Sequence, residues 1–251
     1  MRASTKLKYM LWAGRRWPTA PRDCPGCGSD ATRLIKRKHV VTGLYGCAQC
    51  RLMFRVPKGS LLDDERFYDA EYMHESPSDY THYIDVLRGA EVCPPQSVYD
   101  FGSSWGYGSR QLREHGFTVF SYEVGAGRAR FARDQLGCYC LPSPRAVPQK
   151  VDCFLASHVL EHFADPNALW EIASDVLQPH GVIMLVMPNG EPARERLSGA
   201  RYHQLWGRVH PLLLSADALQ RMAARHGFSG APSGQLDGDE LFFVARRSDA
   251  V

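Results

Sequence analysis

The sequence predicts an α/β protein with a mostly parallel sheet, preceded by a small module of a different kind. Two observations lead to this prediction. After Pro94 and Pro95, short apolar runs alternate with helical patterns through the rest of the 251 residues, and such alternation is typical of a parallel sheet with helices on both faces. Before these prolines, two Cys-x-x-Cys pairs are separated by 19 residues, which indicates a compact module organised by its cysteines.

The first module is predicted from those cysteines. Cys24, Cys27, Cys47 and Cys50 have the spacing of a four-thiolate zinc site. Zinc takes four thiolates in a tetrahedron, and two tight turns joined by a hairpin supply them without a large core. Two buried thiol pairs or disulfides are the alternative, which the spacing and the glycines beside the cysteines disfavour. We therefore expect a zinc ribbon over residues 23–58.

The segments around this ribbon have weaker patterns. Residues 1–22 are basic and predict a partly ordered tail. Within the ribbon, the run I-K-R-K-H-V-V-T at 35–42 predicts a strand. Residues 59–95 carry aromatic side chains three to four positions apart, which predicts a helical connector or lid.

Residues 96–251 are predicted to form the α/β domain. Apolar runs predict strands at 97–101, 117–123, 138–141, 151–156, 181–188 and 240–247. Helical patterns separate these runs, and the last helix has Ser215 as its N-cap and ends at Gly227. Ligands of such sheets bind beyond the carboxyl ends of the strands, which is where we expect the site.

Composition limits the classes of function. No run of 18 apolar residues occurs, so we expect no membrane span. The first residues are basic, but their apolar run is too short and interrupted for a secretory signal. The cysteines outside the two pairs show no metal-ligand spacing, which predicts reduced thiols in a cytoplasmic protein.

Charge is distributed unevenly along the chain. Residues 1–60 contain 13 Lys or Arg and two Asp, a net charge of +11; the whole chain has +3, which leaves −8 for residues 61–251. This asymmetry predicts an anionic partner at the basic N-terminal module: nucleic acid, a phosphorylated substrate or a membrane surface. A solvated basic face is an equally good interpretation.

The loop after the first strand of the α/β domain predicts a nucleoside ligand. It lacks the G-x-G-x-x-G pattern of a dinucleotide site. Asp100, Gly102, Ser104 and Gly106 match Asp-x-Gly-x-small-x-Gly instead, in which glycines let the backbone approach an adenosine-type ligand. Glu123 ends the second strand, where a carboxylate accepts hydrogen bonds from both ribose hydroxyls.

Further motifs connect the chain with a known family. The fourth strand runs into A-S-H-V-L-E-H-F-A-D-P at 156–166, and L-V-M-P-N follows at 185–189. With the loop D-F-G-S-S-W-G and Glu123, residues 97–251 resemble the class I S-adenosylmethionine-dependent methyltransferases. The likeness is greatest to the small-molecule and glycan methyltransferases akin to the ubiquinone-pathway enzymes.

The ribbon and F-Y-D-A-E-Y at 67–72 make the chain similar to a subgroup with an N-terminal zinc ribbon, found among bacterial sugar and polysaccharide methyltransferases. The resemblance implies a seven-stranded Rossmann-like sheet of order 3-2-1-4-5-7-6, with the antiparallel seventh strand at 240–247. Two departures occur. Ser104 replaces the middle glycine, and the Pro-rich segment 142–149 lacks the acidic residue that often holds the adenine amino group.

The resemblance also implies roles for individual residues. S-adenosylmethionine and Zn²⁺ are the expected cofactors, and residues 96–251 the S-adenosylmethionine-binding domain. The expected cofactor-binding residues are Asp100, Gly102, Ser104, Gly106, Glu123, Ser157 and His158. Tyr68, Tyr72 and Trp105 are candidates to face the sulfonium, because cations favour aromatic faces; packing is their alternative role.

Histidines and a carboxylate are the candidates for accepting the acceptor's proton. His158, Glu161 and His162 come first, followed by Tyr202, His203 and His210. Glu161 and His162 recur in the family motif whatever the substrate, so a structural role is their alternative. The aromatic and polar segment 202–211 is the expected acceptor wall.

These patterns predict methyl transfer from S-adenosylmethionine to a small metabolite, with a sugar nucleotide or glycan as the favoured acceptor. The alternative is a zinc-ribbon RNA methyltransferase whose basic module binds phosphate, although no base-stacking pattern is evident. A third interpretation is a non-catalytic zinc-ribbon protein with a degenerate cofactor fold. The intact Glu123 and S-H-V-L-E-H disfavour it.

Overall fold

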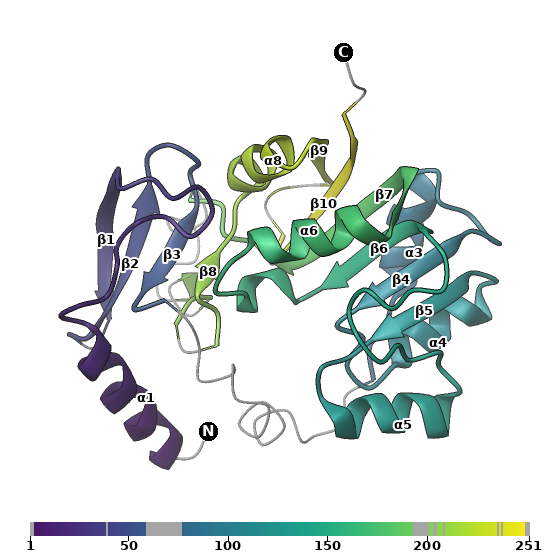
Figure 1. Ribbon diagram of the computed structural model, residues 1–251, viewed down its shortest axis with the longest axis horizontal. Coiled ribbons are helices and arrows are strands. Elements are labelled where there is room, and N and C mark those ends of the chain that lie inside the picture. The colour runs from purple at the N-terminus through teal and green to yellow at the C-terminus, as the bar shows by residue number, and fades with distance from the viewer. Residues whose placement is uncertain are drawn as a thin grey trace.

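The computed structural model describes residues 3–38, 40–58, 77–192, 201–202, 205–207, 209–234, 236 and 238–248. In these parts of the chain, two sheets lie side by side (Figure 1). The smaller sheet belongs to the N-terminal ribbon, and the larger one forms the α/β domain.

The large sheet has the strand order β5-β4-β6-β7-β10-β9. Its strands are β4 (Ser97–Phe101), β5 (Thr118–Tyr122), β6 (Val151–Ser157), β7 (Leu177–Pro188), β9 (Phe228–Ser233) and β10 (Glu240–Arg247). β4 to β7 are parallel, and β10 runs antiparallel to both β7 and β9. This is the predicted order 2-1-4-5-7-6, including the antiparallel strand at 240–247.

The third strand of the predicted sheet is missing from this order. We expected it at 138–141, but this segment forms one isolated bridge, between Ser121 and Cys140. Pro142 follows directly, and proline cannot donate to a ladder hydrogen bond, so pairing stops there. The described sheet therefore has six strands instead of seven.

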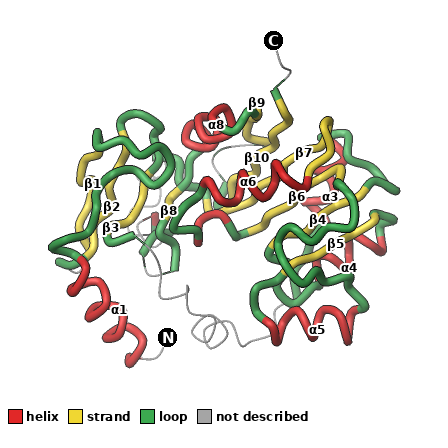
Figure 2. The backbone as a smooth tube through the Cα atoms, in the orientation of Figure 1, coloured by secondary structure: helices red, strands yellow, loops and turns green. Residues whose placement is uncertain are grey.

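Helices cover both faces of the large sheet (Figure 2). They are α3 (Thr81–Gly89), α4 (Tyr107–Glu114), α5 (Ala126–Leu136), α6 (Asn167–Val176) and α8 (Ala216–Arg225), with a 3₁₀ turn η2 (Leu160–His162) after β6. Side chains alternate along each strand. In β4, Val98 packs into the core beside Leu112 of α4, whereas Tyr99 packs into the core that holds Trp170 of α6.

The ribbon consists of β1 (Thr32–Lys38), β2 (Thr42–Cys47) and β3 (Met53–Val56), all antiparallel. The strand predicted at 35–42 is wrong in its bounds, because a turn separates β1 from β2. A fourth strand, β8 (Leu212–Leu213), pairs with β3 although it comes from the α/β domain. The two parts of the chain therefore share one sheet.

Residues Ala3–Arg16 form the helix α1, whereas the sequence predicts a partly ordered tail. The helix docks on the ribbon through Tyr9, whose hydroxyl lies 3.2 Å from Thr42 Oγ1. Arg55 is completely buried, donates to the Tyr9 hydroxyl at 3.1 Å, and lies 5.2 Å above the Trp12 ring. An amphipathic face, which a charge count does not reveal, thus orders this segment.

The predicted connector 59–95 is described only in part. Tyr68 and Tyr72 lie outside the described residues, and α3 occupies part of the remainder. No described helix combines the length and the apolar character that crossing a bilayer requires.

Candidate functional site

A cavity of about 400 Å³ lies at the carboxyl ends of β4, β5 and β6. β5 extends the sheet on one side of β4 and β6 on the other, so this is the topological switch point at which α/β sheets bind ligands. The lining residues are Phe101, Gly102, Tyr122, Glu123, Val124, Pro144, His158, Val159, His162, Phe163, Ala164 and Ile172.

The loop after β4 brings the backbone close to this cavity. Gly102 has φ +82°, and an added Cβ would overlap Cγ2 of Val159. Gly106 has φ +85°, and its added Cβ would lie 2.6 Å from Cβ of Ala132. Only glycine fits these two positions. Ser104 adopts the left-handed region as well, at φ 51°, which is where the family has its middle glycine.

Asp100 lies beneath this loop and is completely buried. Its Oδ2 accepts a hydrogen bond from Ser109 Oγ at 2.6 Å, and its Oδ1 accepts one from the Tyr80 hydroxyl at 3.3 Å. Burial raises the pKa of Asp100 to about 6, and the two hydrogen bonds lower it in part. Asp100 is absent from the cavity lining and ties the loop to α4 and to the start of α3.

Glu123 follows β5 and lines the cavity, although it is 7% exposed. Its Oε1 accepts hydrogen bonds from Gly125 N and Arg128 Nη2, both at 2.7 Å. Its Oε2 accepts one from Ser104 N at 3.0 Å. The carboxylate is thus held in one orientation. The Arg128 contact could not be predicted from the sequence, because it depends on how α5 begins.

His158 lines two cavities at once. Besides the 400 Å³ cavity, it borders one of about 270 Å³ whose other lining residues are Pro188, Arg201, Tyr202, Leu205, Asp239 and Glu240. His158 Nε2 lies 2.8 Å from Glu240 Oε1, and its Nδ1 lies 3.4 Å from Glu161 Oε1. Partial burial lowers the pKa of His158, but the two carboxylates raise it to about 10. The imidazole is therefore charged at neutral pH.

His162 has a different environment. Its Nδ1 donates to Val209 O at 2.8 Å, and its ring lies edge-on to His210, with centroids 4.7 Å apart. Burial lowers the pKa of His162 below the ordinary value, so this imidazole is neutral at pH 7. Of the two histidines that line the 400 Å³ cavity, His162 is the one whose imidazole is neutral and can accept a proton.

The comparison with family profiles is decisive for the class of protein. Residues 68–231 match a profile described as a methyltransferase domain, which is more than half of the chain. The chain belongs to the methyltransferase-domain family. The assignment confirms the predicted enzyme class, an S-adenosylmethionine-dependent methyltransferase. No curated protein sequence matches this methyltransferase.

Solved structures agree on the fold. The magnesium protoporphyrin IX methyltransferase ChlM from Synechocystis PCC 6803 with bound SAH has a TM-score of 0.54 and 13% identity, covering 73% of this chain and 95% of its own. A methyltransferase in complex with the Haloferax volcanii Trm112 methyltransferase activator has a TM-score of 0.56 and 15% identity. The match covers 76% of this chain and 99% of that one. The glycopeptide N-methyltransferase MtfA has a TM-score of 0.53 and 17% identity. The match covers 67% of this chain and 90% of that one.

Two further predicted residues of this methyltransferase do not line either of the two cavities. Ser157 Oγ donates to the Tyr83 hydroxyl at 3.1 Å. Trp105 packs edge-on against Phe131 of α5, with ring centroids 5.2 Å apart, which is the packing role that we considered as its alternative. His203 lies outside the described residues.

Tyr202 is buried on the acceptor wall predicted from the sequence. Its hydroxyl donates to Gly190 O at 3.0 Å. Its ring borders the 270 Å³ cavity together with Leu205, so part of the predicted wall reaches a cavity. Glu240 also lines this cavity and was not predicted, because it belongs to β10, far along the chain.

The four ribbon cysteines converge as predicted. Sγ of Cys24 lies 3.3 Å from that of Cys50, Sγ of Cys27 lies 3.5 Å from that of Cys47, and all four sulfur atoms lie within 4.8 Å of one another. Thiolates 2.3 Å from a tetrahedral zinc are about 3.8 Å apart. A hydrogen bond from Cys24 lowers the pKa of Cys50 to about 5. The donor set and its spacing therefore fit Zn²⁺ and no cysteine forms a disulfide.

Proposed function

We propose that this methyltransferase binds S-adenosylmethionine in the 400 Å³ cavity and transfers its methyl group to an acceptor in the 270 Å³ cavity. The observation that carries the proposal is the position of His158, which lines both cavities. S-adenosylmethionine in one cavity and the acceptor in the other would come into contact beside His158. The favoured acceptor is a sugar nucleotide or glycan.

The donor side fits S-adenosylmethionine in size and in chemistry. A volume of about 400 Å³ is in the range of small-molecule sites. Glu123 Oε2 accepts one hydrogen bond from Ser104, which leaves acceptor capacity for ribose hydroxyls. Gly102 allows close approach of the backbone. Val124 and Pro144 offer apolar surface for adenine, where segment 142–149 has no acidic residue. The cofactor supplies an electrophilic methyl group.

The acceptor side combines charge with an aromatic wall. Arg201 pairs with Asp239 at 3.0 Å, and its side chain is 74% exposed, so it can turn toward an anionic group of an acceptor. Tyr202 and Leu205 supply the wall. His158 already holds a proton, so we assign it to orienting the acceptor. His162 lines the donor cavity and not the acceptor cavity, but it is neutral, so we assign it as the proton acceptor for an acceptor group that reaches past His158.

Calorimetry with S-adenosylmethionine and its demethylated product tests the donor site. We expect Glu123→Gln to weaken binding at least tenfold, because one carboxylate oxygen is replaced by an amide donor facing the ribose. Glu114→Gln, on the exposed end of α4, should bind like the wild type. Failure of the wild-type protein to bind either compound would overturn the proposal.

The choice of acceptor is tested separately, by transfer of a labelled methyl group to nucleotide sugars and to RNA. RNA is the alternative because β1 exposes Arg33, Lys36 and Arg37. Other basic side chains have internal partners: Arg22 lies over Trp17, and Lys58 pairs with Asp23 at 2.6 Å. Labelling of RNA, with affinity that falls steeply with salt, would favour the alternative.

A cytoplasmic location remains a proposal, in line with eight cysteines that form no disulfide.

A further inference from the structure

A second cluster of metal-binding side chains lies apart from the four cysteines. Glu161, His162 and His210 each offer one ligand atom, and these atoms lie within 4.8 Å of one another. Ligands about 2.1 Å from an ion in tetrahedral geometry are about 3.4 Å apart, so a movement of up to about 1 Å by each side chain would close the site.

Both imidazoles in this cluster are oriented by backbone carbonyls. His162 Nδ1 donates to Val209 O at 2.8 Å, and His210 Nδ1 donates to Leu205 O at 2.9 Å. Each bond places the ring proton on Nδ1 and leaves Nε2 with its lone pair. Metal-ligating histidines characteristically donate their other nitrogen to a carbonyl or carboxylate in this way.

Glu161 supplies the observation that points to a ligand. The residue is 2% exposed, and neither carboxylate oxygen has a hydrogen-bond partner. His158 Nδ1 lies 3.4 Å from Oε1, a charge contact without hydrogen-bond geometry. A buried carboxylate without hydrogen bonds is costly even beside the charged His158, and a bound metal ion would satisfy its oxygens.

We propose that Glu161, His162 and His210 bind a divalent transition-metal ion. Two imidazoles and one carboxylate suit Zn²⁺, Fe²⁺ or Mn²⁺ better than Ca²⁺ or Mg²⁺, and three protein ligands leave a coordination position open. His162 also lines the 400 Å³ cavity, so the ion would lie at the wall of that cavity.

The fold explains how these residues meet. The 3₁₀ turn η2 presents Glu161 and His162 directly after β6. His210 is 48 residues further on, and it precedes β8, which pairs with β3 of the ribbon. Arg55 N of the ribbon donates to Pro211 O at 2.7 Å, which fixes the backbone beside His210. The zinc ribbon would therefore position a ligand of the second metal.

The site also refines the proposed function, on which this use of the ion rests. An ion with an open position polarises a bound oxygen and lowers the pKa of a hydroxyl, and an acceptor hydroxyl would reach it by extending from the 270 Å³ cavity past His158. His162 would then act as a ligand and not as the proton acceptor. These two roles exclude each other, and the metal content decides between them. Calorimetry with S-adenosylmethionine tests the donor site independently.

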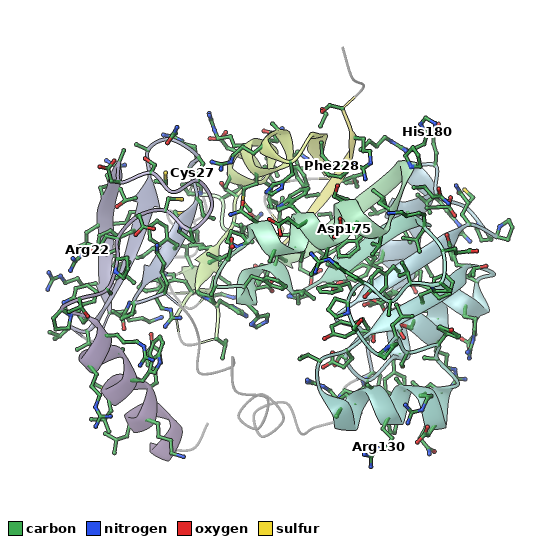
Figure 3. The ribbon with its side chains drawn as sticks, in the orientation of Figure 1. Arg22, Cys27, Arg130, Asp175, His180 and Phe228 are labelled. Carbon is green, nitrogen blue, oxygen red and sulfur yellow. The ribbon has the colours of Figure 1, made fainter. Side chains whose placement is uncertain are left out.

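Metal content of the full chain tests this inference. Wild-type protein saturated with Zn²⁺ and freed of excess should contain two ions per chain, and Glu161→Gln or His210→Ala should contain one. His180→Ala is the matched control, because this exposed histidine lies at the far end of the large sheet from the ribbon (Figure 3) and should retain both ions. One ion in the wild type, or an unchanged content in both variants, would overturn the proposal.

Substitution with Co²⁺ keeps the test decisive if a variant misfolds. Cobalt bound by the four cysteines gives thiolate charge-transfer bands, whereas cobalt bound by nitrogen and oxygen gives only weaker d–d bands. We expect the wild type to show both components, the second of which is lost in His210→Ala while the first persists. A wild-type spectrum with thiolate bands only, at saturating cobalt, contradicts the second site.

Discussion

Replacement of Asp100 by Asn should change how stability depends on pH. Asp100 is completely buried, and its pKa is raised from 3.8 to about 6. The folded chain therefore binds this proton more tightly than the unfolded chain does. The resulting stabilisation is present in full below pH 3.8 and is lost as the pH rises through about 6.

The size of the change in the free energy of unfolding follows from the difference between the folded and unfolded pKa values of Asp100. About two pH units correspond to about 3 kcal/mol. Asn resembles the protonated acid in shape and charge, and Ser109 and Tyr80 can still hydrogen-bond to it. From pH 4 to pH 8, the free energy of unfolding of the wild type should therefore fall by about 2.5 kcal/mol relative to that of Asp100→Asn.

Urea denaturation at several pH values measures this difference. Groups other than Asp100 titrate in both proteins, so their contributions cancel in the comparison. Asp134→Asn, on the exposed face of α5, is the control and should give a curve parallel to the wild type. Parallel curves for Asp100→Asn and the wild type would refute the reasoning.

Three further predictions concern the loop, the buried ion pair and the ribbon. Gly102→Ala should weaken S-adenosylmethionine binding more than tenfold in calorimetry, because the new Cβ is obstructed at φ +82°; Gly127→Ala, with open space around it, should not. Arg128→Met breaks a buried pair with a carboxylate and should lower the free energy of unfolding by about 3–5 kcal/mol, whereas Arg130→Met, whose side chain points away from α5 into solvent (Figure 3), should be neutral in the same urea titration. Cys50→Ser should lower the zinc content by one ion per chain and lower Tm, as should a strong chelator; an unchanged Tm would mean that the metal does not stabilise the fold.

Part of the site could be predicted from the sequence because the patterns that indicate it are local. The Cys-x-x-Cys pairs specify a metal by spacing alone, and all four sulfur atoms do converge. The alternation of strands and helices predicted the mostly parallel sheet, and the family resemblance implied that the strand at 240–247 is antiparallel. Gly102 and Glu123 follow two adjacent parallel strands, whose carboxyl ends meet at one edge, and both line the same cavity.

Only the tertiary structure decided the contacts between distant segments. The helical face of α1 is ordered by Arg55, and a strand of the α/β domain completes the ribbon sheet. His210 meets Glu161 only because that strand fixes its position, and Glu240 reaches His158 only because β10 lies beside β7. Hydrophobic periodicity and residue spacing indicate the local structure of residues that are close together in the sequence. Contacts between side chains that are distant in the sequence depend on the packing of the whole chain. The chemistry of this site arises from such contacts.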